Sequence, residues 1–461
     1  MTATRAPRWY TLAWLLGLPA AALHLCWRSL RQREYLRHWA ERFLGHGASL
    51  AARPGAPVVW VHAVSVGETR AAQPLIEQLA RAHCDAVFVL THMTPTGRAA
   101  GTDLVQAFPG RIQQRYLPYD LPFAVRRFLR QVDPSIGILM ETEIWPNLLY
   151  AARERHVPVV LANARLSQRS LAKALRYREL IRGASACVTI VGAQTQADRG
   201  RVAQLYDGPI RVTGNLKFDL VPDPEQVEQG KGLRARFRER FGERPLWLFA
   251  STREGEERLI LDALRTRGLA DGGSGPASPA PLLLFVPRHP QRFDEVAALL
   301  QERGNAVLRR AHWGVPPDAR PDVAASPRSS AAPSSAVLLG DSMGEMPLYY
   351  GMADVALIGG SLLPLGGQNL IEACACGCPV VLGPHMFNFA QAADDAEAAG
   401  AARRVRDAQQ ALGVMHEISI SAAARQRMAA AALAFSSMHR GATVRTLALI
   451  DDVLASAATG R

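Results

Sequence analysis

The hydrophobic and polar positions of this chain alternate between short apolar runs and longer amphipathic stretches from residue 57 onward. In the first half, five apolar runs have the length of buried strands: 57–64, 86–92, 135–140, 157–164 and 187–192. Helical stretches such as 71–82 and 121–131 separate them. Strands that alternate with helices are typical of a parallel sheet with helices on both faces.

The same alternation starts again in the second half, with apolar runs at 245–251, 281–287, 336–340, 355–360 and 379–383. We therefore predict an α/β protein with two Rossmann-like domains in series. Residues 219–231 are charged and lack an apolar run, so we expect them to join the domains. Residues 268–280 and 314–335 are rich in Pro, Gly, Ala and Ser, which predicts surface insertions. A final helix over 437–456 is expected to pack back toward the first domain.

The N-terminal segment 9–27 carries no charged side chain and has a tryptophan at each end. Its 19 residues are just enough to cross a bilayer, and tryptophans suit the membrane interface. An arginine cluster follows at once and favours a retained anchor with the rest of the chain on the cytoplasmic side: Arg28, Arg31, Arg33, Arg37 and Arg42. The alternatives are a buried amphipathic helix of the first domain and, less favoured, a cleaved signal peptide.

Composition narrows the function classes. With 461 residues, 48% hydrophobic and 20% charged, the chain is neither mostly disordered nor a polytopic membrane protein. Its net charge of +12 indicates an anionic partner: nucleic acid, a phosphorylated metabolite or an acidic membrane. Six cysteines are too few for a disulfide framework, and Cys374, Cys376 and Cys378 alternate too closely for a zinc site. We expect no structural metal.

Ligands of doubly wound folds bind at the carboxyl ends of the strands, so the residues after each apolar run are the candidates. In the first half, Glu68 follows Gly67 at a helix start, where the positive helix end favours the ionised carboxylate that a general base needs. A simple helix cap explains the same pattern, and the spacing alone favours it.

Residues 140–147 hold a second candidate pair, Glu141 and Glu143, followed by Trp145 as a stacking face. Both carboxylates lie on one side if the strand continues through them, whereas a capping loop explains them equally well. Lys217, within 214–219, can meet a phosphate or a developing negative charge, or it can be an ordinary surface lysine.

In the second half, Arg288 follows Pro287 at a strand end, where a guanidinium is a good phosphate ligand; an exposed loop arginine fits equally well. Residues 340–345 open a helix whose amides can hold a phosphate. A glycine-rich loop, 359–372, places Asn369 for a phosphate and Glu372 for ribose hydroxyls. The sequence has no metal-binding DxD pair at a strand end of this half and no P-loop, which argues against an NTPase.

The motifs occur in a fixed order: HAVSVGE, THMTPTG, YLPYDLP, METEIWPN, LANARLS, GNLKFD, PRHPQRF, GDSMGEM and GGSLLPLGGQNLIEA. This ordered set resembles the 3-deoxy-D-manno-octulosonic acid (Kdo) transferase family of lipopolysaccharide biosynthesis over residues 5–440. The resemblance implies a GT-B fold, in which two Rossmann-like domains face across a cleft, plus an N-terminal anchor helix. The expected parts are an anchor (1–45), an acceptor-binding domain (46–222) and a CMP-Kdo-binding domain (223–461).

The implied activity is an inverting transfer of Kdo from CMP-Kdo to the lipid A precursor (lipid IVA) at the cytoplasmic face of the inner membrane, without metal or cofactor. By resemblance, Glu68 is the general base, and Glu141 and Lys217 stabilise the transition state. The residues matched to CMP binding are Pro287, Arg288, Met343, Gly344, Glu345, Asn369, Leu370, Ile371 and Glu372. Arg253 departs from the family pattern, which often has histidine there.

Two other functions remain as alternatives. One is another GT-B enzyme that acts on a UDP-sugar. The other is a membrane-tethered binder of nucleic acid or lipid, which the net charge alone suggests. The candidate motifs contain no basic run interleaved with aromatic residues, so we expect no nucleic-acid partner.

Overall fold

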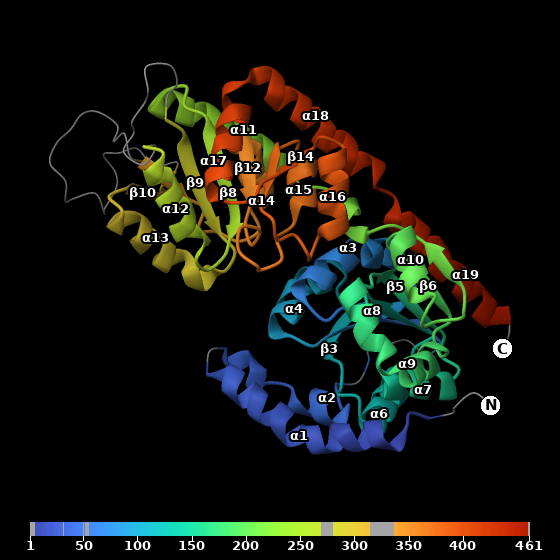
Figure 1. The fold of residues 1–461 in the computed structure, drawn as a ribbon. Coiled ribbons are helices and arrows are strands. Elements are labelled where there is room, and N and C mark those ends of the chain that lie inside the picture. Colours follow the sequence, from blue (N-terminus) through green and yellow to red (C-terminus); the bar gives the residue numbers. More distant parts are fainter. Residues whose placement is uncertain are drawn as a thin grey trace. The chain divides into compact units, whose positions relative to one another are not determined.

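The computed structural model describes residues 5–30, 32–48, 50, 55–268, 280–313 and 336–459. The chain forms two compact units (Figure 1). Unit 1 contains the residues up to Leu220 together with those from His439 on, and unit 2 contains Val221–Met438. The expected surface insertions lie almost wholly outside the described residues.

Unit 1 is built on a seven-stranded parallel sheet with the order β3-β2-β1-β4-β5-β6-β7. Its strands are β1 (Val58–His62), β2 (Val87–His92), β3 (Ile112–Tyr116), β4 (Ile136–Met140), β5 (Val159–Ala164), β6 (Ile190–Ala193) and β7 (Ile210–Val212). The strand order reverses between β1 and β4, which are neighbours. The carboxyl ends of these two strands therefore form the topological switch point, the usual ligand site of the fold.

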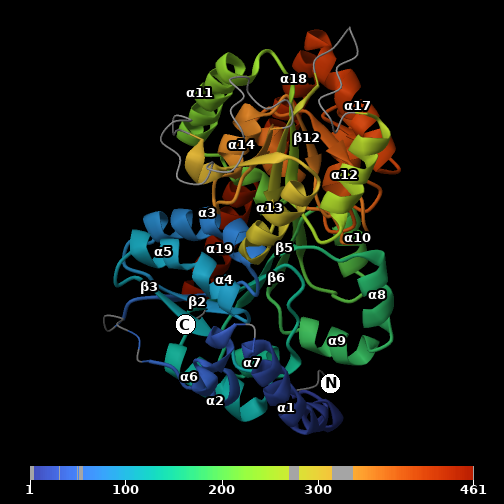
Figure 2. The ribbon, with the colours of Figure 1, turned by 90° about the vertical axis from the view of Figure 1, so that its left-hand side faces the viewer.

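The helices of unit 1 cover both faces of this sheet. They are α1 (Arg8–Ser29), η1 (Arg33–Leu36), α2 (Trp39–Leu44), α3 (Val66–Ala82), α4 (Pro95–Ala100), α5 (Thr102–Ala107), α6 (Pro122–Val132), α7 (Pro146–Glu154), α8 (Gln168–Leu175), α9 (Arg178–Ser185), α10 (Gln196–Val202), η2 (Leu216–Asp219) and α19 (Ala442–Thr459). Helices α6 and α7 lie side by side on one face (Figure 1 and Figure 2). Helices α3 and α19 pack together on the other.

Alternate side chains of β1 fill the two cores of unit 1. Trp60 points toward α6, where its ring lies 5.4 Å from that of Phe128. Val59 and Val61 belong to the opposite core with Leu75 of α3. Because both faces are buried, the strand reads as a continuous apolar run, as parallel sheets do.

Unit 2 repeats the architecture around a second seven-stranded parallel sheet with the order β10-β11-β9-β8-β12-β13-β14. Its strands are β8 (Leu246–Thr252), β9 (Leu282–Pro287), β10 (Ala306–Arg309), β11 (Ala336–Leu339), β12 (Val355–Ile358), β13 (Val380–Leu382) and β14 (Ala402–Arg404). Its helices are α11 (Pro224–Phe241), α12 (Glu256–Thr266), η3 (Pro290–Arg292), α13 (Phe293–Glu302), η4 (Arg310–His312), α14 (Met346–Met352), α15 (Leu370–Ala375), α16 (Ala390–Ala398), α17 (Ala408–Ile420) and α18 (Ala422–Met438). These two Rossmann-like units and the apolar N-terminal helix confirm the predicted α/β, GT-B class.

The boundary between the units, Leu220 to Val221, falls within the predicted linker 219–231, but most of that segment is helical, because α11 begins at Pro224. This helix lacks a clear apolar stripe, and it packs against α14 partly through a small residue, Gly230. A Cβ on Gly230 would lie 2.2 Å from the carbonyl oxygen of Leu348, so only glycine allows α11 to approach α14 this closely. The predicted ranges counted 439–461 with the second domain, whereas these residues belong to unit 1. Helix α19 packs on α3, so the final helix does pack back on the first domain as expected.

The arginine cluster after α1 also needs a correction. Arg28, Arg33 and Arg37 are exposed, but Arg42 is buried. Its guanidinium lies 3.5 Å from the centre of the Tyr116 ring and donates a hydrogen bond of 2.9 Å to the carbonyl of Met93. Arg42 therefore stabilises unit 1 from within and is not part of an exposed basic surface.

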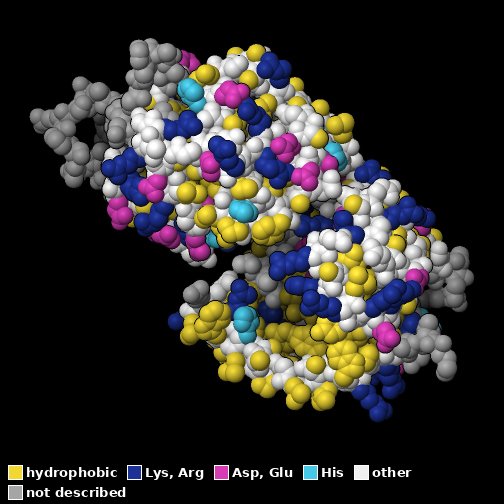
Figure 3. Space-filling view, viewed as in Figure 1, with side chains coloured by type: hydrophobic (Ala, Val, Ile, Leu, Met, Phe, Trp, Pro, Cys, Tyr) yellow, Lys and Arg dark blue, Asp and Glu magenta, His cyan; other side chains and the backbone are white. Residues whose placement is uncertain are grey.

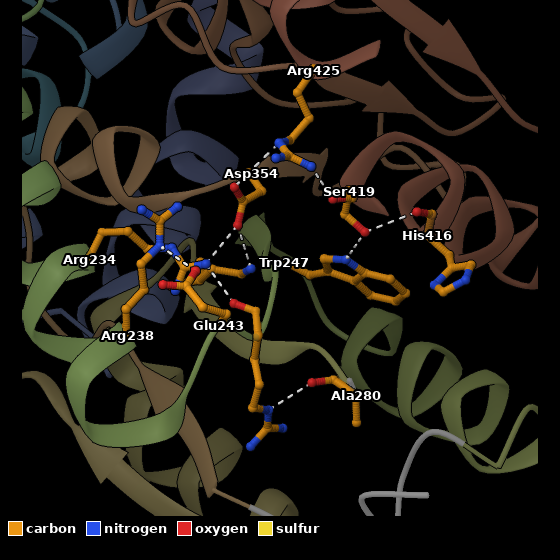
Figure 4. A network of polar contacts seen from close by, with 11 residues as sticks. Arg234, Arg238, Glu243, Trp247, Ala280, Asp354, His416, Ser419 and Arg425 are labelled. Atoms are coloured by element: carbon orange, nitrogen blue, oxygen red, sulfur yellow. Dashed lines mark hydrogen bonds and ion pairs between the residues drawn. The ribbon is translucent and has the colours of Figure 1, made fainter. Parts of the chain in front are cut away.

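A network around Asp354 connects the helices of unit 2 to its sheet at the amino ends of the strands (Figure 4). The Asp354 carboxylate accepts hydrogen bonds from the backbone of Leu246 (2.8 Å) and from Arg234 of α11 (2.9 Å), and Arg425 of α18 lies 3.6 Å away. Arg234 is buried, so its positive charge needs the Asp354 carboxylate to offset the cost of burial.

Replacing Asp354 with Ala is expected to lower the free energy of unfolding by about 3 kcal/mol, because it leaves the Arg234 charge and the Leu246 amide buried without their acceptor. Urea unfolding followed by tryptophan fluorescence measures the change. The matched control is Asp262→Ala, which removes an exposed ion pair with Arg303 and should cost less than about 1 kcal/mol. Equal losses in the two variants would contradict the buried-network account.

Candidate active site

Glu68 lies at the switch point of the first sheet, just after β1. Ser65 is the N-cap of α3, and its hydroxyl accepts the amide of Glu68 at 3.4 Å. The Glu68 carboxylate in turn accepts the amide of Val64 (2.8 Å) and the hydroxyl of Ser65 (3.0 Å). Glu68 thus closes a variant of the capping box, in which its carboxylate accepts the amide of the residue before the N-cap, so the capping alternative holds as well. These bonds also hold its carboxylate over the carboxyl end of β1.

Glu141 follows β4, the strand next to β1, in a strained conformation. Its φ is +58°, in the left-handed region that residues with a Cβ rarely adopt. The strand ends at Met140, so of the two alternatives for Glu141 and Glu143 the one that needs a continuing strand does not apply. The Glu141 amide bonds to the carbonyl of Ala162 (2.9 Å), while the Glu143 carboxylate accepts the indole N–H of Trp145 (2.7 Å).

Lys217 joins this group from the far end of the sheet. Its Nζ lies 3.3 Å from the Glu141 carboxylate, and its side chain is only 16% exposed, so it is not an ordinary surface lysine. Asn215 caps the 3₁₀ helix η2 by accepting the Lys217 amide at 3.0 Å. The buried side chain of Asn163, at the end of β5, accepts the Leu216 amide at 3.0 Å. The position of Lys217 is therefore fixed from two sides.

The final helix reinforces this arrangement through Asp219, the last residue of η2. The Asp219 carboxylate accepts the backbone amides of Gly441 (2.6 Å) and Thr443 at the start of α19. The neighbouring ring of Phe218 stacks on His439 at 4.6 Å. The chain end thus anchors the segment that carries Lys217, a role that the sequence did not suggest.

The surroundings of Glu68 raise the pKa of its carboxyl group toward neutral pH. Burial first, and then the charges of Glu141 and Glu143, raise the pKa of Glu68 to about 7, against the bonds from Val64 and Ser65, which lower it. We expected the helix N-terminus to keep this carboxylate ionised, but burial and like charges outweigh the helix dipole. A carboxylate with a pKa near 7 is a stronger base than an ordinary glutamate.

A pH dependence follows from this shift. Because a general base acts only when deprotonated, kcat/KM is expected to fall about tenfold per pH unit below about pH 7. Replacing Glu141 with Gln removes one repelling charge and should move this acid limb to lower pH, even as it lowers activity. The pH profile of kcat/KM measures both effects. A limb that stays at the same pH in Glu141→Gln would contradict the coupling of these carboxylates.

The candidates of unit 2 lie along the carboxyl edge of the second sheet. After β9, the Arg288 amide donates to Thr252 (3.0 Å) and its Nε donates to Gln368 of the glycine-rich loop (3.1 Å). Pro287 is buried, whereas Met343 and Gly344 are exposed. These segments follow β9, β11 and β12, whose carboxyl ends share one edge.

Glu345 is held by charged and polar neighbours. Arg310 donates two hydrogen bonds to its carboxylate, at 3.0 and 2.9 Å, and the hydroxyl of Ser342 donates another. Burial alone would raise the pKa of Glu345, but these bonds lower it below its ordinary value. The carboxylate is therefore ionised and rigid, and it orders the exposed turn at 343–344.

Residues 369–372 form the start of helix α15: one side chain caps the helix and two others are buried in the core. The Asn369 side chain caps the short helix α15 by accepting the Ile371 amide at 3.1 Å. The side chains of Leu370 and Ile371 are buried in the core, so only their backbone can serve a ligand. Glu372 is half-buried in the first turn of α15.

Glu256 is a site residue that sequence reasoning missed. Its buried carboxylate accepts the amides of Gly360 (2.6 Å), Arg253 (2.9 Å) and Leu362 (3.1 Å). It thereby ties the loop after β8 to the loop after β12, the two neighbours at the second switch point. Two adjacent acids after a glycine at a strand end were the available signal; the second, Glu257, forms a buried ion pair with Arg292 at 2.9 Å.

Within the described part of the chain, no three His, Cys, Asp or Glu side chains gather as metal ligands do. The site set of unit 1, Glu68 with Glu141 and Lys217, is brought together by the fold. The candidate residues of unit 2 lie on the separate loops that follow β9, β11 and β12 at the carboxyl edge of the second sheet. Each set is the one predicted from strand ends, and the supporting residues Asn163, Asp219 and Glu256 were not foreseen as such.

Comparison with known proteins adds independent findings. Residues 37–220 match the family described as 3-deoxy-D-manno-octulosonic-acid transferase (kdotransferase). A 3-deoxy-D-manno-octulosonic acid transferase of Bordetella pertussis is 46% identical over 450 residues, which cover 96% of this chain and 99% of that protein. One of Haemophilus influenzae is 36% identical over 383 residues, 82% of each chain. The structure of Anabaena HepE in complex with UDP matches at 13% identity and a TM-score of 0.56, covering 87% of this chain and 100% of that chain, and shows a shared fold.

Proposed function

The chain belongs to the 3-deoxy-D-manno-octulosonic acid (Kdo) transferase family, and on that premise we propose that it moves Kdo from CMP-Kdo to the lipid A precursor, lipid IVA, with inversion. It is a glycosyltransferase of lipopolysaccharide biosynthesis. The donor, the acceptor, the stereochemistry and the residue roles below are parts of the proposal. The observation that supports it most is the group of Glu68, Glu141 and Lys217 at the switch point of the first sheet.

Glu68 is the proposed general base. In the transfer step its carboxylate takes the proton of the acceptor sugar hydroxyl, and the hydroxyl oxygen forms a bond to the ketosidic carbon of Kdo. The bond between that carbon and the phosphate oxygen breaks, and CMP leaves with the electron pair. Attack opposite the leaving group inverts the anomeric configuration. A pKa of about 7 lets Glu68 accept this proton at neutral pH.

Glu141 and Lys217 are proposed to stabilise the transition state. Positive charge develops on the sugar ring in an oxocarbenium-like transition state, which the Glu141 carboxylate can offset. The Lys217 ammonium can offset the negative charge that develops on the leaving phosphate. Their mutual contact of 3.3 Å and the strained backbone of Glu141 keep both groups in place before the reaction.

For the donor, we propose that CMP is bound by Pro287 and Arg288, by Met343, Gly344 and Glu345, and by residues 369–372. Gln368 orients the Arg288 guanidinium, a good ligand for the phosphate. Because Arg288 supplies a cation for the phosphate of the donor, we propose that the reaction needs no metal ion and no cofactor.

Helix α1 is the proposed membrane element. It is long and apolar enough to cross a membrane by length and composition. Its apolar side chains are largely exposed, including Leu16 at 73% and Leu23 at 71%, and apolar side chains gather on the face around it (Figure 3). We propose that it holds the chain at the cytoplasmic face of the inner membrane, where the acceptor is available.

Contacts of α1 with the rest of unit 1 favour a helix that is embedded in one leaflet of the membrane over a helix that crosses the membrane. The Tyr10 hydroxyl donates to the buried carboxylate of Asp120 at 2.9 Å, and Trp14 packs against Trp145 and Tyr119 at 6.2 and 5.7 Å between ring centres. The first half of the helix is therefore held against protein, which leaves its exposed apolar face for one leaflet of the membrane.

A turnover assay tests the proposal. Purified full-length chain is incubated with CMP-Kdo and the tetraacyl lipid A precursor in detergent, with and without EDTA, and the products are analysed by mass. We expect a mass increase of one or more Kdo units that EDTA does not abolish. Absence of product, with transfer from a UDP-sugar instead, would support the alternative GT-B function and overturn the proposed one.

A further inference from the structure

An apolar pocket of about 260 Å³ lies inside unit 1. Its lining residues come mainly from strands β5 and β6 and from helices α8, α9 and α10, which Figure 1 labels. Its buried wall includes Leu161 of β5 and Val202 of α10, and Ile181 of α9 lines it as well. Glu141, from the catalytic group proposed above, also lines this pocket. The pocket is therefore contiguous with the proposed transfer site and distinct from the capped carboxylate of Glu68.

Small side chains leave this space open. Ala164 at the end of β5, Ala174 on α8 and Ser185 at the end of α9 all line the pocket. Protein interiors are normally packed to high density, so an apolar pocket of this size next to a catalytic group indicates a ligand. Apolar pockets of this kind favour apolar ligands.

The distribution of polar atoms defines the ligand. Most of the buried wall is aliphatic; its buried polar side chains are Ser185 and Tyr206, and the Tyr206 hydroxyl is already bonded to the carbonyl of Val188 at 3.2 Å. The charged lining residues Glu141 and Arg165 are half-buried, and Ser170 is exposed, so they mark the opening. A sugar, base or phosphate inside would lose its hydrogen bonds to water without replacement, whereas a hydrocarbon chain would not.

We propose that this pocket binds one fatty acyl chain of the lipid acceptor, with the polar part of the acceptor at the opening beside Glu141 and Arg165. The inference rests on the proposed function, because it needs an acylated acceptor whose hydroxyl reaches Glu68. A chain that is anchored here positions the acceptor sugar against the base and lets the enzyme sense acylation directly.

The test fills the pocket from α8. Ala174→Phe and the smaller Ala174→Leu place new side chains into it, while the matched control Ala172→Phe adds the same ring at an exposed position of the same helix. Each variant is assayed with CMP-Kdo and two acceptors, the tetraacyl precursor and the same phosphorylated disaccharide stripped of its acyl chains. Thermal unfolding verifies that the variants fold; a filled pocket should keep or raise the melting temperature.

We expect Ala174→Phe to raise KM for the tetraacyl acceptor about tenfold, the effect of excluding roughly two methylene groups from an apolar site. Transfer to the stripped acceptor should match that of the wild type, and Ala172→Phe should change neither. An unchanged ratio between the two acceptors in both Ala174 variants overturns the pocket assignment. If the wild-type chain transfers Kdo to neither acceptor, the proposed function itself is wrong, and the assignment of the pocket to an acyl chain of the acceptor is wrong as well.

A binding readout that needs no turnover separates these failures further. A fatty acid with a diazirine group near its methyl end is photolysed with the wild-type chain, and the labelled peptides are identified by mass. Label on 161–206 that Ala174→Phe abolishes and Ala172→Phe preserves supports the pocket. Label confined to other segments, such as α1, overturns it.

Discussion

Replacing Glu68 with Gln is expected to lower kcat about 10³-fold while CMP-Kdo still binds, because Gln cannot accept the proton of the acceptor hydroxyl. Its amide can keep the capping contacts, since its oxygen can accept the Val64 amide and its NH₂ can donate to Ser65. Single-turnover transfer measures the loss, and calorimetry with CMP-Kdo measures donor binding. The matched control is Glu77→Gln, a half-buried carboxylate on the same helix, which should retain activity.

The same variant has a second signature in stability. The pKa of Glu68 is raised from 4.5 to about 7 in the folded protein, so above pH 7 folding is opposed by the cost of the buried charge. Glu68→Gln removes this cost and should be more stable than the wild type at pH 8, by about 3 kcal/mol, but not at pH 4. A variant that loses turnover and stability together at pH 8 would instead indicate a disrupted fold.

Replacing Lys217 with Met is expected to lower kcat about 10²-fold, because it removes the ammonium that we propose to offset negative charge in the transition state. The loss also leaves Glu141 without its partner at 3.3 Å, and the uncompensated charge should raise the pKa of Glu68 further. The acid limb of the pH profile should therefore move to higher pH, opposite to its expected shift in Glu141→Gln.

Steady-state kinetics across pH measure both effects in the Lys217 variant. Lys231→Met, which removes an exposed lysine of unit 2, is the matched control and should leave the profile unchanged. The double variant Glu141→Gln/Lys217→Met should lose less activity than the product of the single losses, since the two groups act as a pair. Strictly multiplicative losses would contradict a shared role.

The sequence predicted the central strands well and the edges poorly. The four strands that the apolar runs did not reveal are β3, β7, β10 and β14, and each is an edge strand of its sheet. An edge strand is not buried on all sides, so it needs no continuous apolar run. Strand β3 reads IQQRY, with half-exposed glutamines at its centre. Hydrophobic pattern alone cannot separate such a segment from a loop.

In the candidate site too, the sequence pointed to some of the residues, whereas others became visible only in the folded structure. Strand ends and glycine-rich turns made Glu68, Glu141 and Lys217 candidates, because the carboxyl ends of parallel strands must share an edge, but the pattern alone did not separate them from caps and a surface lysine; the family resemblance did. The sequence could not reveal that Asn163 fixes the Lys217 segment, or that Asp219 receives the start of α19 more than 200 residues later. The direction of the Glu68 pKa was also beyond it, since burial and the proximity of Glu141 arise only from the folded chain.

The stereochemistry of the product tests the central claim most directly. If Glu68 activates the acceptor hydroxyl for one direct displacement, the Kdo unit of the product must have the anomeric configuration opposite to that in CMP-Kdo. The measurement is the NMR configuration of the first Kdo linkage formed by the wild-type chain. An inverted linkage is the predicted result. A retained linkage would require two displacements through a covalent intermediate and would contradict the role assigned to Glu68.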